Sequence, residues 1–150
     1  MTTALQPRAP SSHQNASGIV IDAPAILGYR LPQLLARYAS EHGVPLEEAE
    51  LIFQETKKFL ATCAQDNSEN YSPSEEQDAM WHDFILFTKN YTDFCQTFFG
   101  RYLHHVPCDG KKKDPDPCPL KQRATVIFGE ITPRLWAGKP SEMARCCGMC

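Results

Sequence analysis

Apolar residues recur at helical spacing along most of the chain beyond residue 30. The first predicted helix covers 31–42, where Pro32 suits a first helical turn and Gly43 suits the position just after a helix end. Its apolar face consists of Leu31, Leu34, Leu35 and Tyr38. The pattern therefore predicts an amphipathic helix with one buried face.

A second predicted helix covers 45–64, from Pro45 to Ala64. Three glutamates occupy its first turns, where the helix dipole favours anions. An i, i+3, i+4, i+7 stripe follows, made of Ala49, Ile52, Phe53, Thr56, Phe59, Leu60 and Cys63. This spacing predicts a helix with a buried stripe.

The strongest helical pattern begins near residue 73 and meets no helix-breaking residue until Gly100. Ser72, Pro73 and Glu75 supply an N-cap, a first-turn proline and a capping acid. Apolar side chains cover a wide arc of this helix, including Trp81, Phe84, Ile85, Phe87, Tyr91, Phe94, Cys95, Phe98 and Phe99. Such an arc predicts a helix at the centre of the core.

The remaining segments complete the domain prediction. Residues 120–131 have the pattern of a further helix, and 131–140 resembles a packed loop anchored by Trp136. Residues 1–20 are polar and aperiodic, which is typical of a disordered arm. We therefore predict an all-α single domain of four or five helices over 21–150, with a central aromatic helix and a cysteine-rich tail.

Composition narrows the classes of function. The 150 residues are 42% hydrophobic, which is sufficient to build one core. The formal charge of -3 argues against a basic nucleic-acid-binding domain. No apolar run approaches the ~18 residues of a membrane span, and the N-terminus lacks the apolar region of a secretory signal. We therefore expect a soluble, cytoplasmic protein that contacts neither nucleic acid nor membrane.

The cysteines carry the clearest chemical signal. Cys63 and Cys95 fall within helical patterns, whereas five of the seven cysteines follow residue 105: Cys108, Cys118, Cys146, Cys147 and Cys150. Without an export signal, clustered thiols indicate metal ligands or redox groups more than structural disulfides. Cys147 and Cys150 form a CxxC knuckle, and zinc is the metal that such thiolates suit best.

The other ligands of a tail site stay open at this stage. Cys146 is a third candidate, while Cys108 and Cys118 form a more widely spaced pair, and His104 or His105 is a further alternative. The same dithiol also suits disulfide exchange or Cu(I) binding. Equally, the tail is compatible with an exposed segment whose thiols have no function.

Histidines mark a second candidate region. His82 follows Asp78 by four residues, so both side chains share one face of a helix, where a carboxylate orients an imidazole or simply pairs with it. His104 and His105 are adjacent, and in an extended segment at most one of them joins a given site. Cys95 with either histidine resembles a Cys–His nucleophile pair. However, Cys95 lies on the apolar face of its helix, which favours a buried, inert thiol.

The stretch Asp78-Ala-Met-Trp81-His82, followed by FILFTKNYTDFCQTFFGRYLHHVP, resembles the small glycine-rich-domain-containing-like proteins, which share a D-x-x-W-H helix. The resemblance extends to FGEITPRLW and the cysteine-bearing C-terminus, over roughly residues 30 to 150. It implies a mainly helical domain and points to the three histidines named above, but it implies no activity. The glycine-rich region of the larger plant relatives is missing from this chain.

Three hypotheses follow. The leading one is a small zinc-binding protein in which tail thiolates, alone or with a histidine, hold the C-terminus on the helical body. The second is a helical interaction module that binds an unknown protein partner without metal. The third is a metal-dependent enzyme whose site lies around His82, Asp78 and one of His104 and His105.

Overall fold

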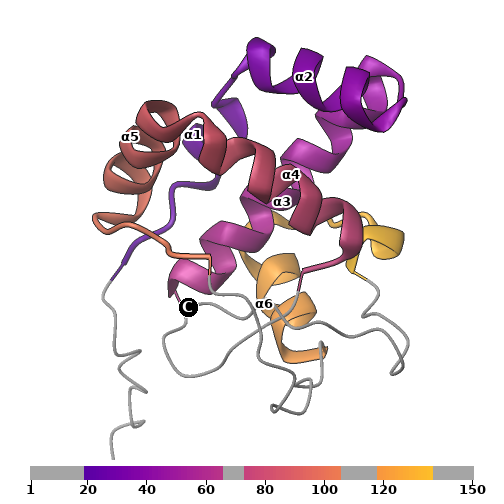
Figure 1. Cartoon of the computed structure of the whole chain (residues 1–150). Helices are drawn as coiled ribbons and strands as arrows, with labels where there is room; N and C mark the ends of the chain where they lie inside the picture. The colour runs from indigo at the N-terminus through magenta and orange to yellow at the C-terminus, as the bar shows by residue number, and fades with distance from the viewer. Residues whose placement is uncertain (1–18, 66–72, 106–117, 137–150) are drawn as a thin grey trace, which may run out of the picture.

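The computed structural model describes residues 19–65, 73–105 and 118–136. This part of the chain is helical and contains no strand, which confirms the all-α prediction, but it contains six α-helices where four or five were predicted (Figure 1). Its elements are α1 (Ala23–Gly28), α2 (Pro32–His42), α3 (Leu46–Gln65), α4 (Glu75–Leu86), α5 (Thr88–Phe99), α6 (Cys118–Phe128) and the 3-10 helix η1 (Pro133–Trp136). None of the described helices combines the length and the apolar character needed to cross a membrane.

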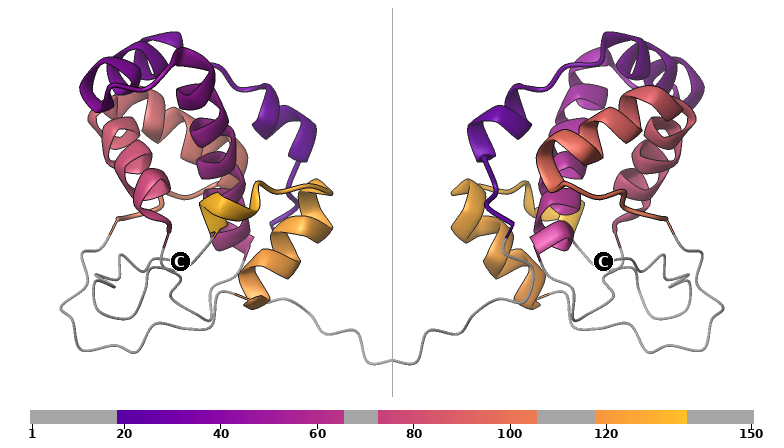
Figure 2. Two further views of the ribbon diagram at one scale, coloured as in Figure 1. Left: turned by 90° about the vertical axis from the view of Figure 1, so that its right-hand side faces the viewer. Right: turned by 90° about the vertical axis from the view of Figure 1, so that its left-hand side faces the viewer.

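Helix α3 lies at the centre of these elements and contacts each of the other five α-helices (Figure 2). Its second half is buried on all sides, since the six consecutive residues from Phe59 to Ala64 are all buried. The prediction that the helix beginning near residue 73 occupies the centre is therefore wrong. The prediction relied on the high aromatic content of that helix. Small buried residues of α3, such as Ala61 and Ala64, instead suit a central helix, because they leave room for neighbouring helices to pack closely around it.

The predicted continuous helix from 73 to 99 is two helices, α4 and α5, which meet at Phe87. The backbone of Phe87 leaves the helical region, with φ -81° and ψ 61°. The bend places the rings of Tyr91 and Phe94 5.1 and 5.3 Å from the ring of Phe84. Ten residues of straight helix would separate Phe84 and Phe94 by about 15 Å along the axis. Packing of the aromatic side chains thus accounts for a break that no proline or glycine signals.

The cap of α4 also differs from the prediction. Ser74 rather than Ser72 is the N-cap, and Gln77 rather than Glu75 completes the capping box, with bonds of 3.2 Å from Gln77 N to Ser74 Oγ and 3.1 Å from Ser74 N to Gln77 Oε1. Gln77 Nε2 also donates to the carbonyl of Glu55 at 3.3 Å. Gln77 therefore ties the start of α4 to α3, a contact that the spacing of residues does not indicate.

Helix α1 was absent from the sequence prediction because six residues are too few to show a period. A buried lysine of α3 connects its end to the core. Lys57 Nζ donates to the carbonyls of Leu27 at 3.1 Å and Tyr29 at 2.9 Å. Burial lowers the pKa of Lys57 to about 7, with the nearby Arg30 lowering it further and Glu50 acting in the opposite direction.

This lysine leads to a prediction about pH. Between the lowered pKa of about 7 in the folded chain and the value of 10.5 when unfolded, the unfolded chain binds more protons, so stability rises with pH. We expect the free energy of unfolding of the wild type, relative to Lys57→Met, to increase by about 2 kcal/mol from pH 7 to pH 9. Urea denaturation of both proteins across this range measures it.

The difference between the two proteins is the informative quantity. Burial raises the pKa of Cys95, which makes stability fall as the pH rises above the ordinary thiol value, but this contribution is common to both proteins and cancels. A difference that stays constant from pH 6 to pH 9 would show that Lys57 remains charged when buried.

The C-terminal part of the described chain packs on α3 as well. Helix α6 begins two residues earlier and ends three residues earlier than predicted. The predicted loop anchored by Trp136 contains η1, and Trp136 is 5% exposed. Glu55 of α3 holds this segment, because its carboxylate accepts hydrogen bonds from Trp136 Nε1 at 2.6 Å and from Thr132 Oγ1 at 3.1 Å. Lys58 Nζ lies 2.9 Å from the same carboxylate and donates to the carbonyl of Glu130 at 2.7 Å.

Candidate metal centre

Helix α4 presents Asp78 and His82 on one face, one turn apart. The capping box at Ser74 and Gln77 begins this helix just before Asp78, and the period of 3.6 residues places Asp78 and His82 on the same face. His82 Nδ1 lies 3.9 Å from Asp78 Oδ2. The aspartate side chain is 20% exposed and that of His82 is 55% exposed, so the pair lies where the helix meets the surface.

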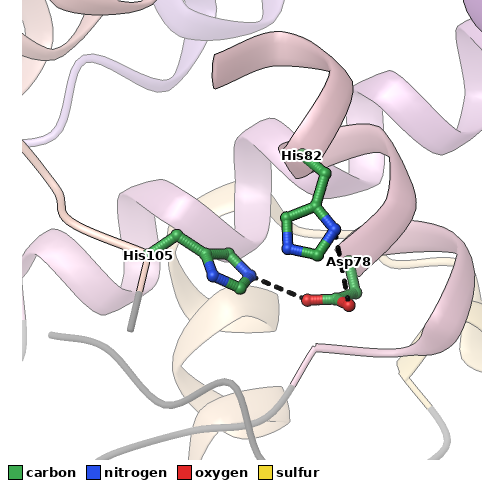
Figure 3. A group of neighbouring side chains, drawn as sticks. All are labelled: Asp78, His82 and His105. Atoms are coloured by element: carbon green, nitrogen blue, oxygen red, sulfur yellow. Dashed lines mark hydrogen bonds and ion pairs between the residues drawn. The ribbon is translucent and has the colours of Figure 1, made fainter. Parts of the chain in front are cut away.

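His105 joins this pair from the segment that follows α5 (Figure 3). Its Nε2 lies 2.9 Å from Asp78 Oδ1, and the centroid of its ring is 4.3 Å from that of the His82 ring. The His105 side chain is only 6% exposed. One carboxylate therefore faces two imidazoles, with a different oxygen nearest to each.

Trp81 and Tyr91 support this arrangement from the buried side. The Trp81 ring stands edge-on to the His105 ring, with centroids 4.5 Å apart. Trp81 Nε1 donates to the Tyr91 hydroxyl at 2.9 Å, and that hydroxyl donates to the carbonyl of Leu103 at 2.6 Å. Burial is the largest of the causes that raise the pKa of Tyr91, so its hydroxyl stays protonated and remains a donor.

The chemistry of Asp78, His82 and His105 suits a metal ion. One ligand atom from each residue lies within 4.8 Å of the others. Two imidazole nitrogens and a carboxylate oxygen are ligands that Zn²⁺ and Fe²⁺ accept, and they bind in the deprotonated state. We name these three residues the His–His–Asp group.

His104 lies away from this group. It is exposed, and its ring centroid is 4.7 Å from that of Tyr102. The two adjacent side chains have different surroundings, since His105 contacts Asp78 whereas the His104 ring lies beside Tyr102. Of the two adjacent histidines, the structure brings only His105 to Asp78.

A second group of possible ligands, Glu41, His42 and Asp83, lies between α2 and α4. Arg37 contacts both carboxylates of this group, with Nη2 2.7 Å from Glu41 and Nε 3.6 Å from Asp83. The His42 ring stacks on Tyr38 with centroids 4.1 Å apart. A guanidinium ion already pairs with both carboxylates, so we interpret the group as an ion-pair network rather than a cation site.

The tail cysteines predicted as ligands, Cys146, Cys147 and Cys150, lie outside the described residues, as does Cys108. Cys118 begins α6, but its side chain is not among those described. Cys63 and Cys95 are both buried. Burial raises the pKa of Cys95, which is the opposite of what a nucleophilic thiol requires.

Sequence reasoning found Asp78 and His82 together because four residues separate them in one helix. It proposed either His104 or His105 without choosing between them, since the choice depends on how the segment after α5 lies against α4. Tyr91 and Trp81 entered the sequence prediction only as members of the apolar arc of their helix. Tyrosine and tryptophan each combine an apolar body with a polar atom, and that was the available signal of a second role.

These observations define a small helical protein with a partly exposed group of two histidines and one aspartate, packed beside a buried Trp–Tyr pair. The chain belongs to the UCP032817-like family, an uncharacterised family whose model matches residues 23–117. The match includes α1 to α5 and the whole His–His–Asp group. Comparison with curated proteins and with solved structures found no match.

Proposed function

We propose that this protein binds a divalent first-row transition metal ion, zinc first among them, through Asp78, His82 and His105. The convergence of these three side chains from α4 and from the segment after α5 is the observation that carries the proposal. Two of them come from one helix turn and the third is 23 residues further along the chain, so tertiary packing creates the group.

The distances support coordination with little rearrangement. Two ligand atoms on a tetrahedral zinc ion, each bonded at about 2.0 Å, are separated by about 3.3 Å. The His105 to Asp78 distance of 2.9 Å and the His82 to Asp78 distance of 3.9 Å lie on either side of this value. The three ligand atoms lie within 4.8 Å of one another, so rotations of these side chains would bring them to the separation that an ion requires.

The exposure of His82 favours a site that is open on one side. Structural zinc sites are closed by four protein ligands, whereas catalytic sites use three and leave a position for water or substrate. Here three protein ligands lie together and one of them is 55% exposed. This feature favours an exchangeable ligand on the metal and, with it, the enzyme hypothesis over a purely structural zinc.

The thiolate site of the tail remains a separate proposal. It involves Cys147 and Cys150, with Cys146, Cys108 or Cys118 as further ligands. Two further points are also proposals. The resemblance to the glycine-rich-domain-containing-like proteins rests on the D-x-x-W-H helix, and a cytoplasmic location rests on composition.

Metal analysis of the full chain, purified without chelator, tests the function. We expect about one zinc per chain in the wild type. In His82→Ala the zinc affinity should fall more than the roughly 10–100-fold that loss of an outer-shell partner causes. Because His82 is exposed, its replacement should leave the fold intact, which circular dichroism checks. His104→Ala, another exposed histidine from the same region, is the matched control and should keep its metal.

A Cys147→Ser/Cys150→Ser variant separates the two sites. If it keeps its zinc while His82→Ala loses it, the metal belongs to the His–His–Asp group. Loss of zinc only in the cysteine variant would move the site to the tail and leave Asp78, His82 and His105 as an ion-pair cluster. A wild type that binds no zinc, cobalt or iron would refute metal binding, and partner capture would then test the interaction module.

A further inference from the structure

We infer that Tyr91 is a positioning residue for this metal centre, which it serves by holding the segment that carries His105 against the helix that carries Asp78 and His82. The inference rests on the proposed function. Tyr91 itself lies in α5, is fully buried and offers no ligand to the group. Its role is to connect the two elements from which the ligands come.

A single hydroxyl makes this connection. The Tyr91 oxygen accepts a hydrogen bond from Trp81 Nε1 on α4 and donates one to the carbonyl of Leu103. Trp81 precedes His82 directly, and Leu103 lies two residues before His105. The hydroxyl therefore acts within two residues of a proposed ligand on each side.

The segment 102–105 needs such an anchor because it has no regular secondary structure, and so no helical ladder fixes its backbone. Buried Cys95 interacts with Tyr91 and with the backbone of Leu103, and the Leu103 side chain is 1% exposed. Together these contacts hold Leu103 in the core. The anchored backbone at Leu103 thereby restrains His105, which follows two residues later and whose side chain is 6% exposed.

Trp81 adds a direct contact to the same arrangement. The indole that donates to Tyr91 also packs against the His105 ring, with centroids 4.5 Å apart. The hydrogen bond from Trp81 Nε1 thus fixes the indole against which the third ligand rests. Loss of the Tyr91 hydroxyl should free both the carbonyl of Leu103 and the indole of Trp81.

Tyr91→Phe tests the inference, since it retains the ring contacts with Phe84 and Tyr102, both at 5.1 Å, and removes only the hydroxyl. We expect the affinity for zinc, measured by competition with a chromophoric chelator in the full chain, to fall about tenfold or more. Ile26→Val is the control for general loss of stability. It removes one buried methylene from α1, which packs on α3, and should bind zinc like the wild type.

A second readout does not depend on metal. Nuclear Overhauser effects between the His105 and Trp81 ring protons, recorded in metal-free protein, should be present in the wild type and in Ile26→Val, and weak or absent in Tyr91→Phe. Wild-type affinity and intact ring contacts in Tyr91→Phe would overturn the inference, as would an equal loss of affinity in Ile26→Val. If the wild type binds no zinc, the proposed function fails, and the ring contacts alone then decide whether Tyr91 positions His105.

Discussion

Replacement of Glu55 by alanine is expected to lower the free energy of unfolding by about 3 kcal/mol or more. Glu55 is 2% exposed, and its carboxylate is the common acceptor for Lys58, Thr132 and Trp136. Alanine would leave the partly buried Lys58 ammonium ion without its carboxylate partner, would remove the acceptor of Thr132 and Trp136, and would also create a cavity. Chemical denaturation followed by far-ultraviolet circular dichroism measures the loss.

The same variant should release the segment that contains η1 from α3. Trp136 fluorescence should then shift to longer wavelength, most clearly in a Trp81→Phe background that removes the other tryptophan. Glu47→Ala is the matched control because Glu47 lies exposed in the first turn of the same helix, and its loss should cost less than about 1 kcal/mol. Similar losses in the two variants would show that Glu55 does not hold the C-terminal segment.

Phe84→Ala should have an effect of similar size, about 3–5 kcal/mol. The Phe84 ring is fully buried and meets four other rings, with centroid distances of 6.0 Å to Tyr29, 5.3 Å to Phe53, 5.1 Å to Tyr91 and 5.3 Å to Phe94. These four rings come from α3, α5 and the segment before α2, while Phe84 itself belongs to α4. Removal of the central ring therefore weakens contacts among four parts of the domain at once.

Phe98→Ala provides the comparison at the margin of the same cluster. The Phe98 ring lies 4.9 Å from that of Phe94 but is only partly buried, so its removal should cost clearly less. Equal losses would indicate that Phe84 is not the centre of the cluster. Thermal and urea unfolding of both variants distinguish the two outcomes.

Much of the helical structure was predictable because it depends on local spacing. The stripe from Ala49 to Cys63 marked α3, and Gly43 and Gly100 marked the ends of α2 and α5, where both residues have positive φ. The errors occurred where tertiary contacts override local preference. The bend at Phe87 depends on rings that meet around Phe84, whereas α1 was missed because its six residues are too few to show a helical period.

The residues of the candidate site likewise differ in how far the sequence could predict them. Asp78 and His82 were found from a separation of four residues, because a helix repeats every 3.6 residues and places such pairs on one face. His105 entered only as one of two alternatives, since its neighbour His104 has the same chemistry and no local signal distinguishes them.

The sequence by itself determined the helical class of this protein, the positions of most of its helices and the i, i+4 pair of Asp78 and His82, because these features follow from interactions between residues close together in the chain. Only the tertiary structure decided that α3 is central, that Glu55 holds the C-terminal segment and that His105 rather than His104 completes the group. These features depend on contacts between residues that are far apart in the chain, and the geometry of such contacts is set by how whole helices pack.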